Sequence, residues 1–407
     1  MSLASFIVGK YLRSRKDSRL VSLISVISVG GISIGVAVLI IALTVLDGFE
    51  NAVSEKITDF NSHIYITGFG KRDIPGSLYV KTELGAIGKE KITSLTPFIS
   101  KSSIVKSKKF YEGIQLIGLP DSASADISRF IVSGEYDVSE KDNYRGVVVG
   151  QKLADKLFVG IGDKLTIFSL MNNKPPSISN PPVVDQFVVR GIFSSGMAQY
   201  DDQRLYISFD HAAELLDMDD MVSGYNIKLN SLENINELAV EMADALGYPF
   251  YVRTIFREHI NIFTWLELQK APIPIILGLI TLVAAFNIVG TLLMIIIEKT
   301  SAIGTLKSLG ASASQITGIF VRMGIILSLT GIALGNFFAF SLSIIQLNFN
   351  IISLPSDVYF LTEVPIDLNP LYYLMVSGIA FVICLLASWI PSRIAARVNP
   401  VTALRFD

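Results

Sequence analysis

The stretch APIPIILGLITLVAAFNIVGTLLMIIIEKTSAIGTLKSLGAS, residues 271–312, joins two kinds of sequence. Residues 271–297 form a run of 27 residues without Asp, Glu, Lys or Arg, whereas residues 298–312 are polar and helix-prone. A run of about 20 apolar residues is enough to cross the hydrocarbon core of a bilayer. The stretch therefore predicts a membrane-spanning helix that is followed at once by a short polar segment.

The composition of the whole chain supports a membrane protein. The 407 residues are 51% hydrophobic and only 17% charged, with a mean hydropathy of +0.52, against about 25% charged residues in ordinary soluble proteins. Three further charge-free runs occupy 20–46, 323–356 and 368–392, while 47–270 has an ordinary soluble composition. We therefore expect an integral membrane protein with four transmembrane α-helices and a large α/β domain inserted between the first and the second.

The basic residues predict the orientation, because short loops rich in Lys and Arg stay in the cytoplasm. The first twenty residues, the segment after the second span and the tail after the fourth are basic, whereas the loop 348–370 is acidic and has no Lys or Arg. Both termini are therefore expected in the cytoplasm, with the insert and the loop 348–370 on the outer side of the membrane. The expected parts are an amphipathic N-terminal helix at 1–20, spans at 21–47, 271–297, 317–347 and 371–392, an outer α/β domain at 48–270, a cytoplasmic segment at 298–316, an outer loop at 348–370 and a cytoplasmic tail at 393–407.

The insert is expected to be a mixed α/β domain. Runs of Val, Ile, Tyr and Phe bounded by Gly, Asn and Asp predict strands, and the candidates are 63–69, 77–82, 113–119, 146–150, 164–170, 186–193, 204–209, 225–230 and 249–255. Helical patterns occur at 151–158, 209–217 and 232–246, the last with Asn230 and Ser231 as expected caps. An amphipathic run at 256–272 is expected to continue into the second span as one rigid rod.

Catalytic motifs are absent from the sequence. The three histidines, His63, His211 and His259, are far apart, so that a metal site is not expected. No G-x-x-x-x-G-K-[ST] motif occurs, which predicts that the chain does not hydrolyse ATP. The single cysteine, Cys384, falls in the fourth span and is expected to be a packing residue. We therefore expect a non-enzymatic protein without a cofactor and without a nucleic-acid partner.

Small residues in the spans predict close helix packing. Gly31 and Gly35 in the first span, and Gly331 and Gly335 in the third, have GxxxG spacing, which lets membrane helices approach closely. Packing within the chain and a dimer interface are both compatible with this spacing. Asn287 in the second span is expected to face protein or a cavity.

The polar segment after the second span predicts a two-turn helix from Ser301 that Gly310 terminates. Ile303, Leu306 and Leu309 lie at helical spacing and form one apolar ridge. A helix of this size is not expected to bury the ridge against itself. The ridge either lies on the membrane surface or docks into a groove of another protein.

Several motifs along nearly the whole chain resemble those of the lipoprotein-releasing ABC permeases of the LolC/LolE type. They are FNIVGTLLMIIIEKTSAIGTLKSLGASASQITGIF, the N-terminal FIVGKYLRSRK and VSLISVISVGGISIGVAVLIIALTVLDGFE, KITDFNSHIYI, the loop LPSDVYFLTEVPIDLNP and the C-terminal PSRIAARVNPVTALR. The order of one span, a large domain and three spans is shared with MacB and FtsX permeases. The resemblance implies a MacB-like (type VII) ABC permease fold. It also implies a multi-pass protein of the bacterial inner membrane, with the α/β domain at 48–270 and the loop at 348–370 in the periplasm.

The resemblance implies that the segment after the second span is a coupling helix for a separate cytoplasmic LolD-like ATPase dimer, which binds the ATP. By position, the residues of this contact are Glu298, Lys299, Ile303, Leu306, Lys307, Leu309, Gly310 and Ala311. The implied partners also include a second permease subunit, identical or different, and a LolA-like periplasmic lipoprotein carrier.

The stretch SLMNNKPPSISNPPVVDQF, residues 169–187, joins two predicted strands through a proline-rich tip. Proline restricts the backbone and removes hydrogen-bond donors, so the tip is expected to be stiff. The resemblance implies a carrier-binding hook as in LolC-type subunits, and an ordinary long hairpin loop is the alternative. The hook residues would be Lys174, Pro175, Pro176, Pro181 and Pro182.

The function that the resemblance implies is ATP-driven extraction of lipoproteins from the inner membrane and their transfer to the carrier. An apolar cavity between first and second spans would hold the lipoprotein, with wall residues Leu43, Leu46, Phe49, Ile275, Leu279 and Val283; each is also compatible with a lipid-facing or packing position. The alternatives are a MacB-like efflux permease, an FtsX-like permease that signals without moving cargo, and a membrane scaffold that works without an ATPase.

Overall fold

A computed structural model describes residues 19–76, 78–87, 91–108, 110–141, 143–169, 182–218, 220–354, 361 and 363–399. The chain divides into two compact units, which we describe separately. The helical unit comprises residues 1–51, 264–353 and 363–407, and the α/β unit comprises residues 52–263 and 354–362. Most of the expected N-terminal helix, the last eight residues of the tail and most of the loop 355–362 lie outside the described residues.

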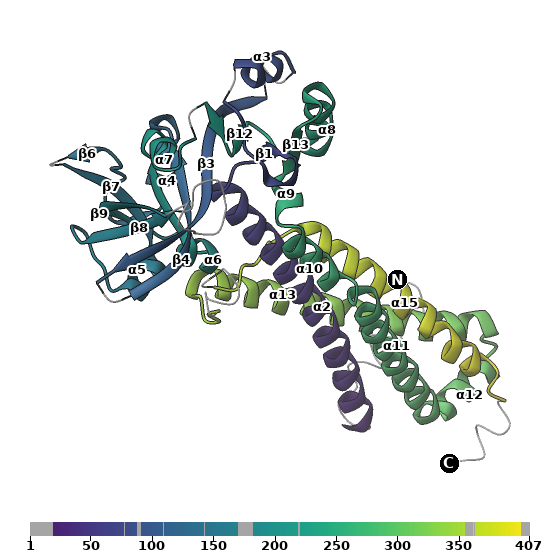
Figure 1. The fold of residues 1–407 in the computed structure, drawn as a ribbon. Coiled ribbons are helices and arrows are strands. Elements are labelled where there is room, and N and C mark those ends of the chain that lie inside the picture. Colours follow the sequence, from purple (N-terminus) through teal and green to yellow (C-terminus); the bar gives the residue numbers. More distant parts are fainter. Residues whose placement is uncertain are drawn as a thin grey trace. The chain divides into compact units, whose positions relative to one another are not determined.

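The described residues contain four helices that are long and apolar enough to cross a membrane, which confirms the expected number of spans. They extend over Leu23–Phe60, Ile260–Glu298, Ala313–Phe349 and Pro370–Ala396. Figure 1 labels the elements of the helical part of the chain: α2 (Arg19–Phe60), α10 (Ile260–Lys270), α11 (Ile273–Glu298), α12 (Thr300–Ser308), α13 (Ala313–Phe349) and α15 (Pro370–Ala396).

The first span, rather than the second, continues out of the membrane as an unbroken rod. Helix α2 has 42 residues, which gives a length of about 63 Å at about 1.5 Å per residue and exceeds the roughly 30 Å of a bilayer core. Before the second span, helix α9 (Ile255–Glu258) ends at His259, and α10 ends two residues before α11. The expected rod over 256–272 is interrupted at His259 and at residues 271 and 272, although the second span as a whole extends from Ile260 to Glu298. The second interruption arises because Pro272 and Pro274 lack the N–H groups that would continue α10.

Both GxxxG motifs pack helices of the same chain together. A Cβ atom on Gly31 would lie 2.7 Å from Nδ2 of Asn287 on α11, and one on Gly331 of α13 would lie 2.8 Å from Cβ of Ile32 on α2. Such distances leave no room for a side chain. The glycines therefore let α2 lie directly against α11 and α13, and Asn287 faces protein as expected. Cys384 is fully buried in the same core.

The described residues of the α/β unit form one eleven-stranded sheet and a small two-stranded one. The strands are β1 (Ile64–Gly68), β2 (Ile74–Pro75), β3 (Ile92–Ser107), β4 (Phe110–Leu119), β5 (Ile131–Gly134), β6 (Glu140–Lys141), β7 (Tyr144–Gly150), β8 (Lys164–Ser169), β9 (Val183–Phe193), β10 (Arg204–Ser208), β11 (Met221–Val222), β12 (Gly224–Leu229) and β13 (Phe250–Thr254).

Short helices cover this sheet. They are α3 (Leu78–Ile87), α4 (Ser124–Ser128), α5 (Gln151–Leu157), α6 (Ala198–Gln203), α7 (Phe209–Leu215), α8 (Ile235–Leu246) and α9, with 3₁₀ turns η1 (Phe69–Lys71) and η2 (Asp121–Ala123). Helices α3 and α8 pack beside each other (Figure 1).

Part of the large sheet closes on itself. Strands β3, β4, β10, β7, β9 and β8 pair in this order, and β8 pairs back with β3. Alternate residues of these strands, with α5 and α7, form an apolar core that includes Val105, Leu116, Val147 and Phe187. The first half of β3 continues the sheet through β12, β1 and β13. The β8–β9 hairpin is therefore anchored in a closed ring.

Eight of the nine predicted strands are confirmed to within three residues at each end. The ninth, 77–82, is wrong, because residues 78–82 begin helix α3, whose Val80 and Leu84 are buried at helical i,i+4 spacing. The sequence analysis also missed β3, the longest strand. Helix α8 begins at Ile235 after Asn234, so Asn230 and Ser231 do not cap it.

Candidate functional site

The segment between the second and third spans forms the expected short helix, α12. It begins at Thr300, one residue before the prediction, and ends where Gly310 adopts a positive φ of 95°. The N–H of Gly310 donates to the carbonyl of Lys307 and the N–H of Ala311 donates to that of Leu306, both at 3.0 Å. This pattern satisfies carbonyls at the helix end and favours glycine, as the sequence predicted.

The expectation that the apolar ridge of this helix lies on the membrane surface or docks into another protein is wrong for two of the three ridge residues, which pack on other helices of the same chain. Ile303 is 1% exposed and belongs to the core of the helical unit, and Leu306 is half-buried against that core. Only Leu309 is free, with 80% of its surface exposed. The reason is that α12 packs against α11 and shares one core with Ile316 of α13 and Ala395 of α15.

Lys307 ties α12 to the last turn of α15. Its Nζ donates to the carbonyls of Ala396 at 2.9 Å and Val398 at 2.7 Å, and a cation at a helix C-terminus is favourable because carbonyls there lack helical partners. Lys307 therefore has a structural role that the sequence analysis did not predict. Glu298 and Lys299, which are half-buried, sit where α11 ends, 3.9 Å from each other.

The surface that α12 leaves open is a small polar patch around Leu309. It consists of the exposed residues Thr305, Ser308, Leu309 and Gly310, with Ala311 half-exposed. We call these residues the α12 patch. Ser312 then starts α13 with a capping box in which its side chain and that of Gln315 exchange hydrogen bonds with each other's backbone. The patch is thus held between two well-defined helix ends.

Some of the residues that were expected to line the cavity are buried inside the helical unit, and others are exposed on its surface. Leu43 and Phe49 on α2 are 7% and 9% exposed, and Phe49 packs edge-on against Trp265 with ring centroids 6.0 Å apart. The assignment of these two residues to an open cavity wall is wrong for this chain alone, because α2 buries this face against the other helices. Leu46 is half-buried.

The three wall residues on α11 are exposed. Ile275, Leu279 and Val283 expose 67%, 57% and 58% of their surface. The exposed face of α2 is a different one from the predicted face and was missed by the sequence analysis; it carries Leu23, Val26, Ile27, Ile34 and Val38. Helical spacing places these residues on one stripe. Each of the two spans therefore presents an uncovered apolar stripe.

The loop before the fourth span packs on the end of the first. The N–H of Asp367 donates to the carbonyl of Thr44 at 3.0 Å, and Nδ2 of Asn51 donates to Oδ2 of Asp367 at 3.0 Å. A Cβ atom on Gly48 would lie 2.8 Å from the carbonyl oxygen of Pro365. Lys270 forms an ion pair with Glu50 beside this contact. These bonds join α2, α10 and the loop at one end of the helical unit.

The proline-rich stretch connects two antiparallel strands, since Ser169 at the end of β8 pairs with Val183 at the start of β9; residues 170–181 lie outside the described residues. Four of the expected hook residues, Lys174, Pro175, Pro176 and Pro181, lie outside the described residues. Pro182 is exposed and precedes β9.

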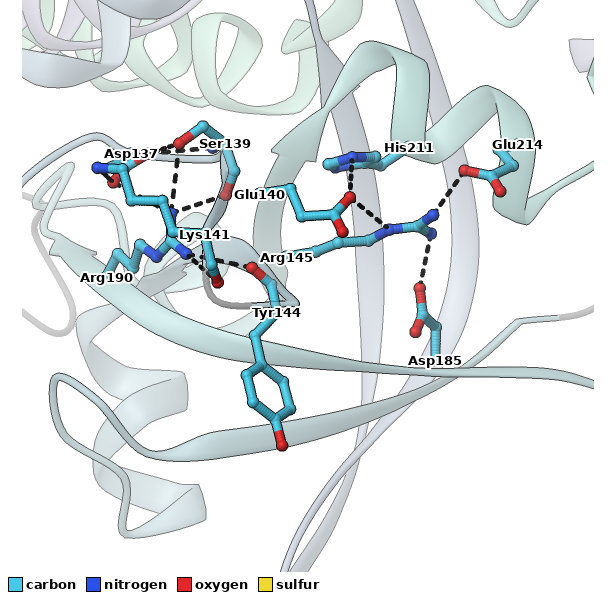
Figure 2. A network of polar contacts seen from close by, with 10 residues as sticks. All are labelled: Asp137, Ser139, Glu140, Lys141, Tyr144, Arg145, Asp185, Arg190, His211 and Glu214. Atoms are coloured by element: carbon cyan, nitrogen blue, oxygen red, sulfur yellow. Dashed lines mark hydrogen bonds and ion pairs between the residues drawn. The ribbon is translucent and has the colours of Figure 1, made fainter.

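Figure 2 shows two groups of charged side chains, one around Arg145 and one around Arg190. Arg145 on β7 contacts Asp185 on β9 at 2.8 Å and Glu214 on α7 at 2.6 Å. Nearby, Arg190 of β9 contacts Asp137 at 3.1 Å. Burial raises the pKa of Asp137, but hydrogen bonds from Lys141 and Ser139 and the charge of Arg190 outweigh it, so the pKa is well below its usual range. Both clusters hold β9 in place.

The histidines occupy separate structural positions. His63 Nδ1 accepts a hydrogen bond from the N–H of Leu229 at 2.9 Å, and His259 Nε2 lies 2.7 Å from the hydroxyl of Tyr200. Burial, with the charge of Arg145, lowers the pKa of His211. Across the described ranges, no group of three or more His, Cys, Asp or Glu residues is arranged to hold a metal ion.

Comparison with known proteins shows where this arrangement belongs. Residues 25–245 match the family described as "MacB-like periplasmic core domain", and residues 274–400 match "FtsX-like permease C-terminal". The chain is 26% identical to the lipoprotein-releasing system transmembrane protein LolC of Xylella fastidiosa (strain Temecula1), with 98% of this chain and 97% of that protein covered. It is 26% identical to LolE of Haemophilus influenzae, with 99% of each covered.

Among solved structures, the periplasmic region of MacB from Actinobacillus actinomycetemcomitans covers 49% of this chain and 92% of its own, with 16% identity and a TM-score of 0.33. The two family matches together extend over both units described above. The chain therefore belongs to the family of integral-membrane permeases that join a MacB-like periplasmic core domain to an FtsX-like C-terminal region, and it is similar over its whole length to LolC and LolE.

Proposed function

We propose that this chain is the membrane subunit of an ABC transporter that extracts lipoproteins from the inner membrane and passes them to a periplasmic carrier. The observation that carries the proposal is the similarity to LolC and LolE along essentially the whole chain. Extraction exposes acyl chains to water at about 0.8 kcal/mol per CH₂. The process needs an energy source, and a separate ATPase subunit supplies it because this chain has no P-loop motif.

The orientation in this proposal places α12 in the cytoplasm. Arg393 and Arg397 lie at the C-terminal end of α15, to which Lys307 of α12 bonds. Asp367 and Glu363 belong to the loop at the other end of α15. Cytoplasmic loops carry the excess of Lys and Arg. The α/β unit then lies in the periplasm.

The ATPase binds at the α12 patch. Ile303 is buried in the helical core, and Lys307 bonds to the end of α15. A displacement of the patch is therefore transmitted directly to α13 and α15. Helix α2 is unbroken from Arg19 to Phe60, so a movement of the first span reaches the α/β unit along one rod.

The uncovered stripes of α2 and α11 form the lipoprotein path. They are apolar, and in a pair of permease subunits, identical or different, they face acyl chains or the second subunit. The stripe residues Ile275, Leu279 and Val283 remain our assignments for this path, and Ile34 and Val38 replace Leu43 and Phe49.

The β8–β9 tip docks the carrier. Four prolines within residues 175–182 restrict the free tip, so less entropy is lost when a partner binds. Replacing residues 174–182 by a Gly/Ser linker of equal length should leave ATPase activity intact, abolish carrier binding in a pull-down and retain a model lipoprotein in the inner membrane.

The matched control places Gly-Ser at residues 108–109, in the turn of the neighbouring β3–β4 hairpin, and should bind the carrier normally. Unchanged carrier binding and lipoprotein release in the 174–182 variant would refute the proposed hook. That result would favour a MacB-like efflux permease or an FtsX-like signalling permease.

A further inference from the structure

The α/β unit contains a cavity of about 680 Å³ that the proposed transport path does not use. Its lining comes from the last turn of α2, from strands on both sides of the sheet and from the α9–α10 junction, and includes Asn61, Tyr65, Tyr200, Arg204, Asn226 and Arg253. The volume falls within the range of about 300–1,000 Å³ that is usual for small-molecule sites.

Arg204 is the one cation of this lining without an ion pair among the described residues. Lys101 contacts Asp73 at 2.6 Å, Lys228 contacts Asp126 at 2.7 Å, and Arg253 pairs with Glu258. Each of these carboxylates also lines the cavity. The acids therefore balance three of the four cations, and the cavity retains one positive charge.

Aromatic side chains hold the Arg204 guanidinium in a fixed plane. Its carbon lies 3.4 Å from the centroid of the Tyr200 ring and 5.6 Å from that of Phe60. Its polar contacts, to Asn61 Oδ1 and the Tyr206 hydroxyl, are both long at 3.5 Å. A guanidinium stacked in this way keeps its in-plane N–H groups available, and their fork geometry matches a carboxylate or a phosphate.

The wall of the cavity beside Arg204 is polar. Asn226 from β12 and Arg253 from β13 both pair with Tyr65 of β1, so the three side chains share one face of the sheet. All three residues line the cavity. A polar wall of this kind favours a polar ligand over an apolar one, because a buried polar group without a partner is costly.

We propose that this cavity is a binding site for a small oxyanion, a carboxylate or a phosphate ester, with Arg204 as its main ligand. Tyr200 orients the guanidinium, and its own hydroxyl is held by His259 at 2.7 Å. The site is independent of the transport function proposed above, since none of its residues belongs to the α12 patch, the β8–β9 tip or the stripes of α2 and α11.

The test uses the full chain in nanodiscs, in buffer free of phosphate and carboxylate. Equilibrium dialysis with radiolabelled inorganic phosphate and, separately, with radiolabelled succinate measures binding and distinguishes the two kinds of oxyanion. We expect saturable binding of one molecule of at least one probe per chain. Hydrogen exchange of residues 199–206 should slow when the probe is bound.

Gln203→Glu is the decisive variant. Gln203 is exposed, precedes Arg204 and lines the cavity, so a carboxylate there competes with the oxyanion for Arg204 without disturbing a packed core. We expect the affinity to fall by about tenfold or more, since a charge-assisted hydrogen bond contributes on that scale. Arg204→Gln should abolish binding.

Lys164→Gln is the matched control, because Lys164 also stacks on a tyrosine, at 3.8 Å from the Tyr144 ring centroid, but lies outside the cavity. It should leave the affinity unchanged. Absence of saturable binding of both probes would overturn the proposal, and so would an equal loss of affinity in Lys164→Gln and Gln203→Glu.

Discussion

Replacing Leu309 by alanine tests whether the α12 patch is the place where an ATPase binds. Leu309 is the apolar residue of the patch, and 80% of its surface is exposed. The helix end is formed by the backbone of Gly310 and Ala311, so the substitution removes apolar surface without changing the fold of α12. A docked ATPase would cover this side chain.

The size of the effect follows from that exposure. Burying a whole leucine side chain contributes about 1.5–3 kcal/mol. A bound ATPase would cover the exposed four-fifths of the Leu309 side chain, so truncation to alanine should cost roughly 1–2 kcal/mol of binding free energy. Since about 1.4 kcal/mol corresponds to a tenfold change in affinity, Leu309→Ala should weaken ATPase binding by roughly 5- to 30-fold.

Leu306→Ala provides the contrast within the same helix. Leu306 is half-buried against the core of the helical unit, and truncation of a fully buried leucine costs about 2–5 kcal/mol of stability. The Leu306 variant should therefore lose part of that stability, while the folded protein keeps its affinity for the ATPase.

The assay is the affinity of the co-purifying ATPase for the permease in nanodiscs, measured by biolayer interferometry and accompanied by thermal unfolding. Phe349→Ala is the control, because Phe349 is 74% exposed at the opposite end of α13 and should affect neither quantity. An affinity of the Leu309 variant within twofold of the wild type would refute the docking of the ATPase on this patch.

Three further predictions concern stability. Gly331→Ala should lower the thermal stability of the protein in detergent by about 1–3 kcal/mol, because overpacking is costly and the added Cβ would lie 2.8 Å from Cβ of Ile32. Asp201→Ala should cost about 2–4 kcal/mol in the same assay, since it removes the acceptor for the N–H and the hydroxyl of Ser195, both at 2.7 Å. Burial lowers the pKa of His259 in the folded state, so the unfolded chain binds more protons than the folded chain below about pH 6.5. The free energy of unfolding should therefore keep its full value above that pH and decrease towards pH 5.5. His259→Gln should reduce this decrease.

The first two stability predictions each have a control in the same element. Gly318→Ala, also in α13 and with open space around its Cβ position, should not destabilise. Asp202→Ala breaks a surface ion pair with Lys156 and should cost at most about 1 kcal/mol. Equal losses in either pair of variants, or a stability that does not change between pH 7.5 and 5.5, would contradict the corresponding argument.

Local rules explain which features of the fold could be predicted from the sequence. The ends of the charge-free runs predicted four spans, and Gly310 predicted the end of α12 because a positive φ is costly for other residues. Eight strands followed from clusters of β-branched and aromatic residues. These features depend on neighbours in the sequence or on the choice between lipid and water.

Strand β3 shows where such rules fail. Its inward-facing positions include Lys101 and Ser103, which are 7% and 6% exposed. Polar residues therefore occupy buried positions of this strand, and the polar and apolar pattern of its sequence does not identify the buried face. Lys101 is buried because Asp73 neutralises it, and Ser103 because its hydroxyl lies 2.7 Å from that of Ser169. Both partners are distant in the sequence.

The sequence by itself determined that the chain crosses a membrane four times, carries a large α/β insert and ends α12 at Gly310, because uncharged length, strand propensity and backbone restriction act locally. Only the tertiary structure decided which apolar residues remain exposed. It buried Ile303, Leu43 and Phe49, and it left Leu309, Ile275 and Ile34 uncovered. It also brought Asn61, Arg204 and Arg253 to one cavity. The physical reason is that burial and charge compensation depend on what packs on each side chain, and those partners come from distant parts of the chain.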